Sequence, residues 1–354
     1  MGYMPYKRDG RRMMLLCEGS FDSHNAKTAT GPLKWCPQDV VAVIDSRTAG
    51  RDPVDIVGFG HGIPIVATLA EAIALGGNQL VVGVANLGGV LPWGFRPILI
   101  EALKRGCDVA CGLHEILSED PELVALARKH QATIYDLRLV PDVPCATNQA
   151  RTLANKRILA VGTDCNVGKM FATLSLTEEL KKRGRDAVFA ATGQTGILIS
   201  GFGYCIDRAI SDFAAGIAER LILDTADHEW VFVEGQGSID HPSYSGVTLS
   251  LLHGTAPQAL ILCHVHSRSG RRHDEGSPLL PLKDLVFLYE TIARPILPAK
   301  VLGVSVVTRG LSEAEARSEL AGIEDRLGLP ATDPVRFGVK NLADTVEAFY
   351  AKQE

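Results

Sequence analysis

Short apolar runs alternate with amphipathic segments through the first part of the chain. An apolar run of about four to eight residues bounded by turn residues is typical of a buried strand, whereas apolar residues spaced three or four apart are typical of a helix. We therefore predict strands at 13–17, 40–45, 79–85, 108–111 and 133–136, and helices at 64–75, 95–105 and 121–130. This alternation predicts a parallel sheet with helices on both faces and ligands at the carboxyl ends of its strands.

The pattern breaks at 141–153, where prolines and small polar residues interrupt the apolar periodicity. It then resumes, with predicted strands at 158–161, 186–191, 228–234, 259–264 and 301–308, and predicted helices at 169–180, 210–224, 282–293, 313–327 and 341–351. The expected fold class is α/β, with two domains that each contain a parallel sheet. We place a flexible leader at 1–12, a first domain at 13–150 and a second domain at 151–354.

The most informative stretch is RILAVGTDCNVGKMFATLSLTEEL, residues 157–180, in which an apolar strand, a polar loop and a helix follow one another. Gly168 allows the backbone to pass close to an anion, the first helical N–H groups point into the loop, and Lys169 adds a positive charge. This pattern predicts a phosphate site. The alternative is an ordinary glycine turn with a solvated lysine, but the order of strand, glycines, lysine and helix favours the phosphate loop.

The loop departs twice from the strict pattern G-x-x-x-x-G-K-[ST]. Five residues separate Gly162 from Gly168, and Met170 stands where a hydroxyl would hold Mg²⁺. We therefore expect the anion site to remain, although the usual metal ligand is missing from its position.

A carboxylate follows the strand predicted at 228–234. The sequence HEWVFVEGQG places Glu234 at the carboxyl end of that strand, the edge at which open parallel sheets bind ligands. A carboxylate there can hold Mg²⁺ or a metal-bound water, or it can accept a proton from a substrate amine.

Composition restricts the classes of partner. The chain has 354 residues, of which 46% are apolar and 22% charged, and its net charge is −5. No basic face is evident, so we expect no nucleic-acid partner. No apolar stretch approaches the length of a membrane span, and eight cysteines without C-x-x-C pairs are typical of reduced thiols. We expect a cytoplasmic homo-oligomer without a membrane partner.

Several motifs together resemble one known family. The loop GTDCNVGK and the EGQG element at 234–237 resemble those of dethiobiotin synthetase. The closer resemblance is to a bacterial and archaeal family long described as a domain of unknown function and now as D-glutamate N-acetyltransferase-like. Its marks run in order through both halves of the chain: AKTATGPLKW (26–35), VVAVIDSRTAG (40–50), GGVLP (88–92), GLHEIL (112–117), GTDCNVGKM (162–170), ATGQTGI (191–197), VEGQGS (233–238), HPSYSGVTLSLLHG (241–254) and LCH (262–264).

The resemblance implies a Rossmann-like first domain, a phosphate-loop second domain, and transfer of an acetyl group from acetyl-CoA to the amino group of D-glutamate or a similar acidic amino acid. One departure follows the loop lysine: relatives have threonines there, whereas Phe171 and Ala172 precede the first hydroxyl, on Thr173. CoA carries phosphates that N–H groups and a lysine can bind without a metal, so Met170 is compatible with this cofactor. We therefore assign no metal ligands for acetyl transfer.

Transfer to an amine needs a base, donors for the thioester oxyanion and cations for the substrate carboxylates. The base candidates are Glu234, His241 and His264, and the N–H groups of the turn at 235–238 are candidates for the oxyanion site. The residues expected to bind the cofactor are Gly162, Thr163, Asp164, Cys165, Asn166, Val167, Gly168, Lys169 and Met170. The residues expected to bind the small-molecule amino acid are Lys27, which we expect in a loop, Gln194, Ser238, Tyr244 and Arg268.

Two other functions stay open on the sequence alone. A ligase or kinase resembling dethiobiotin synthetase would use ATP and Mg²⁺ to activate a carboxylate, with Lys169 on the phosphates and Glu234 with Asp164 or Thr173 on the metal. A non-catalytic nucleotide- or CoA-binding regulator would leave the polar residues at 238–254 without a purpose. Cys165 at a helix N-terminus can also carry an acyl group, but loop packing is the better interpretation because the sequence fixes no base beside it.

Overall fold

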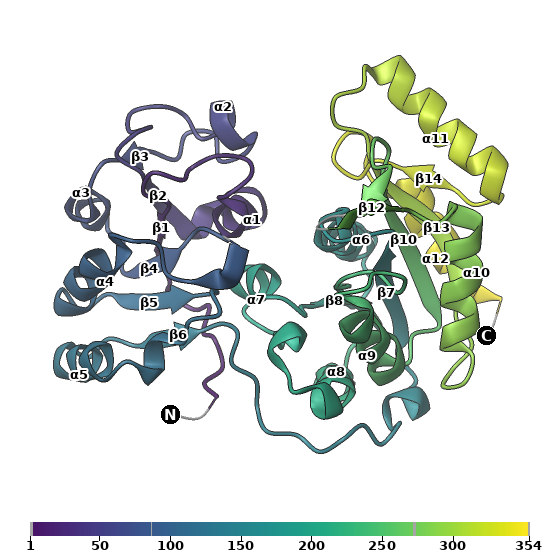
Figure 1. Cartoon of the computed structure of the whole chain (residues 1–354), viewed down its shortest axis with the longest axis horizontal. Helices are drawn as coiled ribbons and strands as arrows, with labels where there is room; N and C mark the ends of the chain where they lie inside the picture. The colour runs from purple at the N-terminus through teal and green to yellow at the C-terminus, as the bar shows by residue number, and fades with distance from the viewer. Residues whose placement is uncertain (1–2, 86, 272–273, 353–354) are drawn as a thin grey trace. The chain divides into compact units, whose positions relative to one another are not determined.

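A computed structural model of the chain describes residues 3–85, 87–271 and 274–352 (Figure 1). The chain divides into two compact units, each built around its own parallel sheet. The first unit comprises Met1–Pro141 with Gly193–Arg208, and the second comprises Asp142–Thr192 with Ala209–Glu354. The predicted α/β class with two parallel sheets is confirmed.

The sheet of the first unit has six parallel strands in the order β3-β2-β1-β4-β5-β6. The chain enters at the middle of the sheet, fills one side and then returns to fill the other, which leaves β1 beside β4 at the point where the direction of filling reverses. This is the Rossmann-like order. The strands are β1 (Met13–Leu16), β2 (Val40–Ile44), β3 (Ile65–Val66), β4 (Gln79–Val82), β5 (Asp108–Cys111) and β6 (Ile134–Asp136).

One helix of the first unit has its predicted bounds because the sequence contains strong helix-capping residues. The predicted helix at 121–130 is confirmed to the residue, because the Asp120 side chain accepts from the N–H groups of Glu122 and Leu123 and Pro121 occupies the first helical position. The helices are α1 (Lys27–Trp35), α2 (Val54–Val57), α3 (Leu69–Ala74), α4 (Phe95–Lys104), α5 (Pro121–His130) and α7 (Gln194–Ser200).

Two predictions in the first unit are wrong. The helix expected at 64–75 is shorter, because β3 occupies 65–66 and the Thr68 side chain caps α3 by accepting from the Glu71 N–H. Lys27, which we expected in a loop, is the first residue of α1. Thr, Gly and Pro give that segment a low helix propensity, and packing against α7 outweighs it. A Cβ on Gly31 would lie 2.6 Å from Thr195 Cγ2, so glycine is what permits the two helices to approach.

The expected flexible leader also differs from the structure over its later residues. The Tyr6 hydroxyl donates to Gln79 Oε1 at 2.6 Å, and the buried Arg11 guanidinium donates to the carbonyl of Leu198 and forms an ion pair with Asp39 at 2.9 Å. Residues 1 and 2 lie outside the described residues. The packed part of the leader therefore belongs to the first unit.

The sheet of the second unit also has six parallel strands, in the order β14-β13-β10-β7-β9-β8. Strand β7 lies between β10 and β9, is buried over nearly its whole length and is apolar from Ile158 onward, as expected for a strand with both faces covered. The strands are β7 (Lys156–Gly162), β8 (Ala187–Ala190), β9 (Trp230–Val233), β10 (Ala259–Val265), β13 (Lys300–Val307) and β14 (Ala331–Thr332); β11 (Gly270–Arg271) and β12 (Asp274–Pro278) form a separate antiparallel pair.

Helices cover the second sheet and share its core. Apolar side chains of β7, β9 and β10, among them Ile158, Phe232 and Ile261, form one buried cluster with Leu176 of α6 and Val346 of α12. The sequence 245–255, noted only for its polar residues, forms the helix α9. The helices are α6 (Lys169–Lys182), α8 (Ser211–Leu223), α9 (Ser245–Thr255), α10 (Leu282–Ala293), α11 (Glu313–Leu327) and α12 (Lys340–Ala351).

The division into units differs from the single break we placed between 150 and 151. Residues 193–208 lie in the first unit, where the side chain of Gln194 packs so closely on Gly112 that a Cβ there would be 2.6 Å from Gln194 Cγ. Arg138, which is largely buried, forms an ion pair with Asp207. These contacts join sequence positions that no local pattern connects.

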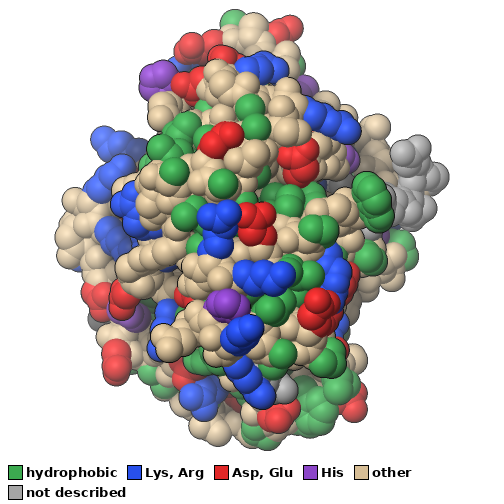
Figure 2. Space-filling view, turned by 90° about the vertical axis from the view of Figure 1, so that its left-hand side faces the viewer, with side chains coloured by type: hydrophobic (Ala, Val, Ile, Leu, Met, Phe, Trp, Pro, Cys, Tyr) green, Lys and Arg blue, Asp and Glu red, His purple; other side chains and the backbone are tan. Residues whose placement is uncertain are grey.

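The surface shown in Figure 2 carries Lys and Arg as well as Asp and Glu side chains, so this face has mixed charge. Within the described residues, no helix has the length and apolar character needed to cross a membrane.

A buried carboxylate fixes the segment that leads into the second sheet. Glu219 of α8 is 4% exposed and accepts from the N–H of Thr147 at 2.7 Å, from the Thr147 hydroxyl at 3.0 Å and from the N–H of Gln149. Charge-assisted hydrogen bonds of this kind are stronger than neutral ones.

We expect Glu219→Gln to lower the free energy of unfolding by about 2–4 kcal/mol, because the amide that replaces one oxygen would face N–H donors instead of accepting from them. Urea unfolding at neutral pH measures the change. The matched control is Glu178→Gln, whose side chain is half exposed and contacts Lys181 at 3.5 Å; it should change stability by less than about 0.5 kcal/mol. Equal effects of the two variants would contradict this role for Glu219.

Candidate functional site

The predicted strand, loop and helix at the start of the second unit are present. Strand β7 ends at Gly162 and helix α6 begins at Lys169, with Asn166 (φ 54°) and Gly168 (φ 91°) in left-handed conformations that turn the loop between them. Gly162 has no room for a side chain, since a Cβ there would lie 2.8 Å from Val167 Cγ2 and 2.9 Å from Lys169 Nζ. The loop is therefore wrapped closely around the lysine ammonium.

Lys169 is buried, and its ammonium group has two main-chain acceptors. Nζ donates to the carbonyl of Asp164 at 2.8 Å and to the carbonyl of Gly237 at 2.9 Å. Burial lowers the pKa of the ammonium, while neighbouring anionic groups, including Asp164 and Glu234, act in the opposite direction. The lysine thus ties the loop after β7 to the turn after β9, so an anion that contacts Nζ must compete with these carbonyls.

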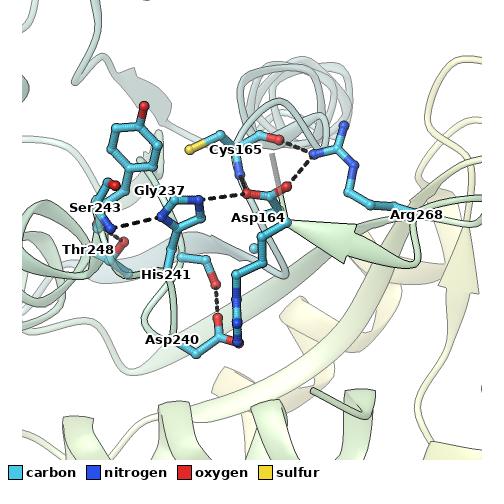
Figure 3. Close-up of polar contacts among 12 residues, drawn as sticks. Asp164, Cys165, Gly237, Asp240, His241, Ser243, Thr248 and Arg268 are labelled. Atoms are coloured by element: carbon cyan, nitrogen blue, oxygen red, sulfur yellow. Dashed lines mark hydrogen bonds and ion pairs between the residues drawn. The ribbon is translucent and has the colours of Figure 1, made fainter. Parts of the chain in front are cut away.

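Asp164 is fully buried at the centre of the polar contacts drawn in Figure 3. One carboxylate oxygen accepts from the N–H of Cys165 at 2.6 Å, and the other pairs with Arg268 at 2.7 Å. The same guanidinium nitrogen also donates to the carbonyl of Cys165 at 2.6 Å. Asp164 and Arg268 therefore fix the conformation of the loop tip.

His241 faces Asp164 from the opposite side, and its ring is almost completely buried. Its Nδ1 accepts from the N–H of Ser243 at 3.1 Å, which places the proton of the neutral ring on Nε2. Nε2 lies 3.7 Å from the Asp164 carboxylate. Tyr244 packs beside the imidazole, with ring centroids 4.6 Å apart. Both ring nitrogens thus face partners within the protein.

Glu234 follows β9 at the carboxyl edge of the sheet, as predicted, and is 6% exposed. Its Oε2 accepts from the N–H of Thr192 at 3.0 Å, and the Thr192 hydroxyl donates to the Glu234 carbonyl at 2.7 Å. The next residue must be glycine, because a Cβ on Gly235 would lie 1.7 Å from the carbonyl oxygen of Ala160. This close approach carries the turn over the end of β7.

His264 comes from β10 and lies at the same edge. Its Nδ1 is 3.1 Å from the hydroxyl of Thr163, the first loop residue. Burial, and then the neighbouring Arg268, lower the pKa of this imidazole to about 4. His264 is therefore neutral near pH 7 and is a weak proton acceptor.

Tyr289 of α10 was not among the predicted site residues. Its buried hydroxyl donates to the carbonyl of Gly162 at 2.7 Å and accepts from the N–H of Ile239 at 3.0 Å, so one side chain connects the loop after β7 to the turn after β9. Burial raises the pKa of the phenol to about 12. The helical pattern at 282–293 predicts the helix, but it gives no sign of this long-range contact.

An ion pair between Arg271 and Asp240 was also missed. Arg271 donates to one oxygen of Asp240 at 2.6 Å, and the Ser238 hydroxyl donates to the other oxygen at 2.6 Å. Ser238 was predicted to bind substrate, and in the structure it is fully buried. The only sign of this ion pair in the sequence is that two basic residues, Arg268 and Arg271, follow a predicted strand three positions apart.

The predicted residues separate into two groups. The loop residues 162–170 lie in the second unit with Glu234, Ser238, His241, Tyr244, His264 and Arg268, and polar contacts connect most of them. Lys27 and Gln194 belong to the first unit, at the first positions of α1 and α7.

The hydroxyl of Thr173, which we considered as a Mg²⁺ ligand, forms hydrogen bonds within its own helix. Thr173 is fully buried, and its Oγ1 donates to the carbonyls of Lys169 at 2.9 Å and Met170 at 3.1 Å. Among the described residues, no group of three or more His, Cys, Asp or Glu side chains is arranged to hold a metal ion.

These features define a class of protein, with a Rossmann-like unit joined to a unit that has a phosphate-type loop at the edge of a parallel sheet. The model of a P-loop domain of unknown function, DUF1611_C, matches residues 144–343, and that of a Rossmann-like domain of unknown function, DUF1611_N, matches residues 46–139. The chain belongs to the DUF1611 family.

Similar proteins match over both units. A D-glutamate N-acetyltransferase from Tritonibacter scottomollicae is 42% identical over 329 residues, which cover 91% of this chain and 94% of that protein. A protein of the same name from a Pseudoalteromonas species is 40% identical over 276 residues, covering 78% and 83%. The crystal structure of a DUF1611 family protein from Anabaena variabilis is 34% identical, with a TM-score of 0.91, and covers 96% of this chain and all of that one. The predicted family is confirmed.

The depressed pKa of His264 predicts a pH dependence of stability. Because the folded-state pKa of about 4 lies below the ordinary value of 6.5, the unfolded chain binds this proton first, and stability is lost as the pH falls below about 6.5. The loss from this group is about 2 kcal/mol between pH 7 and pH 5. His264→Gln should remove that component when the free energy of unfolding is measured by urea at both pH values. A variant whose acid sensitivity matches the wild type would contradict the assignment to His264.

Proposed function

We propose that the protein is an N-acetyltransferase that moves the acetyl group of acetyl-CoA to the amino group of D-glutamate or a similar acidic amino acid. The observation that carries this proposal is the similarity, at 42% and 40% identity over most of the chain, to two proteins named D-glutamate N-acetyltransferase. The site in the second unit offers a phosphate-type loop, a carboxylate and an arginine, which are groups that this reaction can use.

The loop at 162–170 is our candidate for the phosphates of CoA. The start of α6 offers main-chain N–H groups to an anion, and Lys169 offers an ammonium group. Because CoA phosphates need no metal ligand, Met170 and the helix-bound hydroxyl of Thr173 are compatible with this cofactor. When an anion binds, the Lys169 ammonium would exchange one or both of its carbonyl acceptors for phosphate oxygen.

Glu234 is our candidate for the base. The Nδ1 of His241 is held by a main-chain N–H and its Nε2 faces Asp164, so His241 is better suited to position Asp164. The pKa of His264 near 4 makes that imidazole a weak acceptor that remains on Thr163. Glu234 has a carboxylate at the edge of the sheet beside the loop, with one oxygen oriented by Thr192.

In the proposed reaction, the ammonium of the amino acid gives a proton to Glu234, and the free amine attacks the thioester carbonyl carbon. The C–N bond forms, the C–S bond breaks, the CoA thiolate takes the proton that Glu234 returns, and the second proton that the nitrogen loses passes to solvent. N–H groups of the turn at 235–238 are the candidates for stabilising the oxyanion, and Arg268 is the candidate for one substrate carboxylate. Arg268 already orders the loop through Asp164, so substrate and cofactor sites would share one support.

One assay separates this reaction from the two alternatives. The protein is incubated with D-glutamate and either acetyl-CoA or Mg-ATP, and free thiol and ADP are measured. Thiol release that EDTA does not change supports acetyl transfer, whereas ADP release that EDTA abolishes supports carboxylate activation. Tight binding of CoA or ATP with neither product supports a regulator.

We expect Glu234→Gln to lower kcat by about 100-fold or more with little change in the KM for acetyl-CoA, because the amide cannot accept the proton but keeps its hydrogen bond to Thr192. Steady-state thiol release measures both parameters. The control is Glu229→Gln, just before β9, whose side chain is nearly half exposed and pairs with Lys156; it should keep wild-type kcat. A Glu234→Gln enzyme with wild-type kcat would exclude Glu234 as the base.

A further inference from the structure

We propose that Arg271 binds the side-chain carboxylate of a dicarboxylic amino acid, while Arg268 binds the carboxylate next to the reacting amine. This inference rests on the proposed function, since it concerns how that substrate is recognised.

The first observation is an unsatisfied donor. Arg271 Nε is buried and has no hydrogen-bond partner within the described part of the chain, although the guanidinium forms an ion pair with Asp240 through another nitrogen. A buried donor without an acceptor is unfavourable, and a guanidinium edge presents two parallel N–H groups that match a carboxylate. A ligand carboxylate would supply the acceptor that the protein does not.

The second observation is the pairing of the two arginines. Both follow β10, three residues apart, and each pairs with one aspartate: Arg268 with the buried Asp164, and Arg271 with Asp240, whose side chain is 7% exposed. His241 lies 3.7 Å from Asp164 and directly follows Asp240 in the sequence. The two ion pairs are therefore linked through His241 and the main chain that joins it to Asp240.

The contacts of Arg268 decide which carboxylate it takes. Arg268 donates to the carbonyl of Cys165 in the loop where we place the cofactor, so we assign to Arg268 the carboxylate next to the amine that attacks that cofactor. Within the described part of the chain, Arg271 makes no hydrogen bond to that loop. It donates instead to Asp240, in the turn that also contains Ser238. The more distant carboxylate is thus assigned to Arg271.

Asp240 would act as an internal competitor for Arg271. In the absence of ligand, its carboxylate neutralises a guanidinium whose side chain is only 13% exposed. This arrangement distinguishes a binding role from a structural one. If the ion pair is only structural, loss of Arg271 and loss of Asp240 should weaken ligand binding equally. If Arg271 binds a ligand carboxylate, loss of Asp240 leaves the Arg271 guanidinium available to that carboxylate.

The test uses glutarate, a dicarboxylate that has no amine and cannot be acetylated, with binding measured by calorimetry on the full chain. We expect Arg271→Gln, and also Arg271→Lys, to weaken glutarate binding about 10- to 100-fold, because neither side chain offers the forked pair of donors. Asp240→Asn should bind glutarate as tightly as the wild type or more tightly. The control is Arg317→Gln on α11, an exposed residue paired with Glu313, which should bind as the wild type does.

Kinetics gives the second readout. In Arg271→Gln, kcat/KM for D-glutamate should fall about 10- to 100-fold while that for D-glutamine, whose side chain is uncharged, stays within about twofold. Circular dichroism and the unfolding midpoint show whether each variant is folded. If Arg271→Gln does not fold, Arg271→Lys, which keeps the positive charge, is used in its place.

Several results would overturn the inference and leave the proposed function intact. They are wild-type protein that acetylates D-glutamate but does not bind glutarate, full rescue by Arg271→Lys, equal losses in Arg271→Gln and Asp240→Asn, or equal losses for D-glutamate and D-glutamine. Conversely, an absence of acetyl transfer together with Arg271-dependent glutarate binding would reject the reaction and retain the carboxylate site.

Discussion

The ammonium group of Lys169 is the interaction on which the second unit's polar edge depends. It is enclosed by the loop after β7 and bound to carbonyl oxygens of Asp164 and Gly237, so it joins two turns that come from different strands. A buried cation without acceptors would be very unfavourable, and these two carbonyls therefore select one relative position of the turns. Tyr289 reinforces the same junction from α10.

Charge pairs extend from this junction in two directions. Asp164 forms an ion pair with Arg268 and faces His241. Asp240, which precedes His241 in the sequence, forms an ion pair with Arg271. Buried ion pairs add little net stability in general, because desolvation offsets most of their attraction. Their presence at the ligand edge of a parallel sheet is better explained by a function that needs cations for anionic groups. Glu234 and His264 lie at that same edge.

Local sequence signals were sufficient for most of the fold. Strand β5 and helix α5 match their predicted bounds to the residue, because apolar runs and an Asp-Pro helix start act within a few residues. Helices α1 and α9 were not predicted, since packing stabilises their low-propensity sequences. In the site, the loop motif located Lys169 and the strand end located Glu234. Tyr289 and the Arg271–Asp240 pair could not be predicted, because contacts between residues 127 and 31 positions apart leave no periodic trace in the sequence.

The placement of α7 has a consequence for how the chain matures on the ribosome. Residues 193–208 complete the first unit, yet they are synthesised after β7, α6 and β8 of the second. The amino-terminal sheet therefore waits for its last helix while part of the other sheet has already emerged, and domain-by-domain folding in strict order of synthesis is not available to this topology. A fragment that begins after the break near residue 141 would contain α7 without the first sheet, and the apolar residues Ile197, Leu198 and Ile199 would lose the partners that bury them.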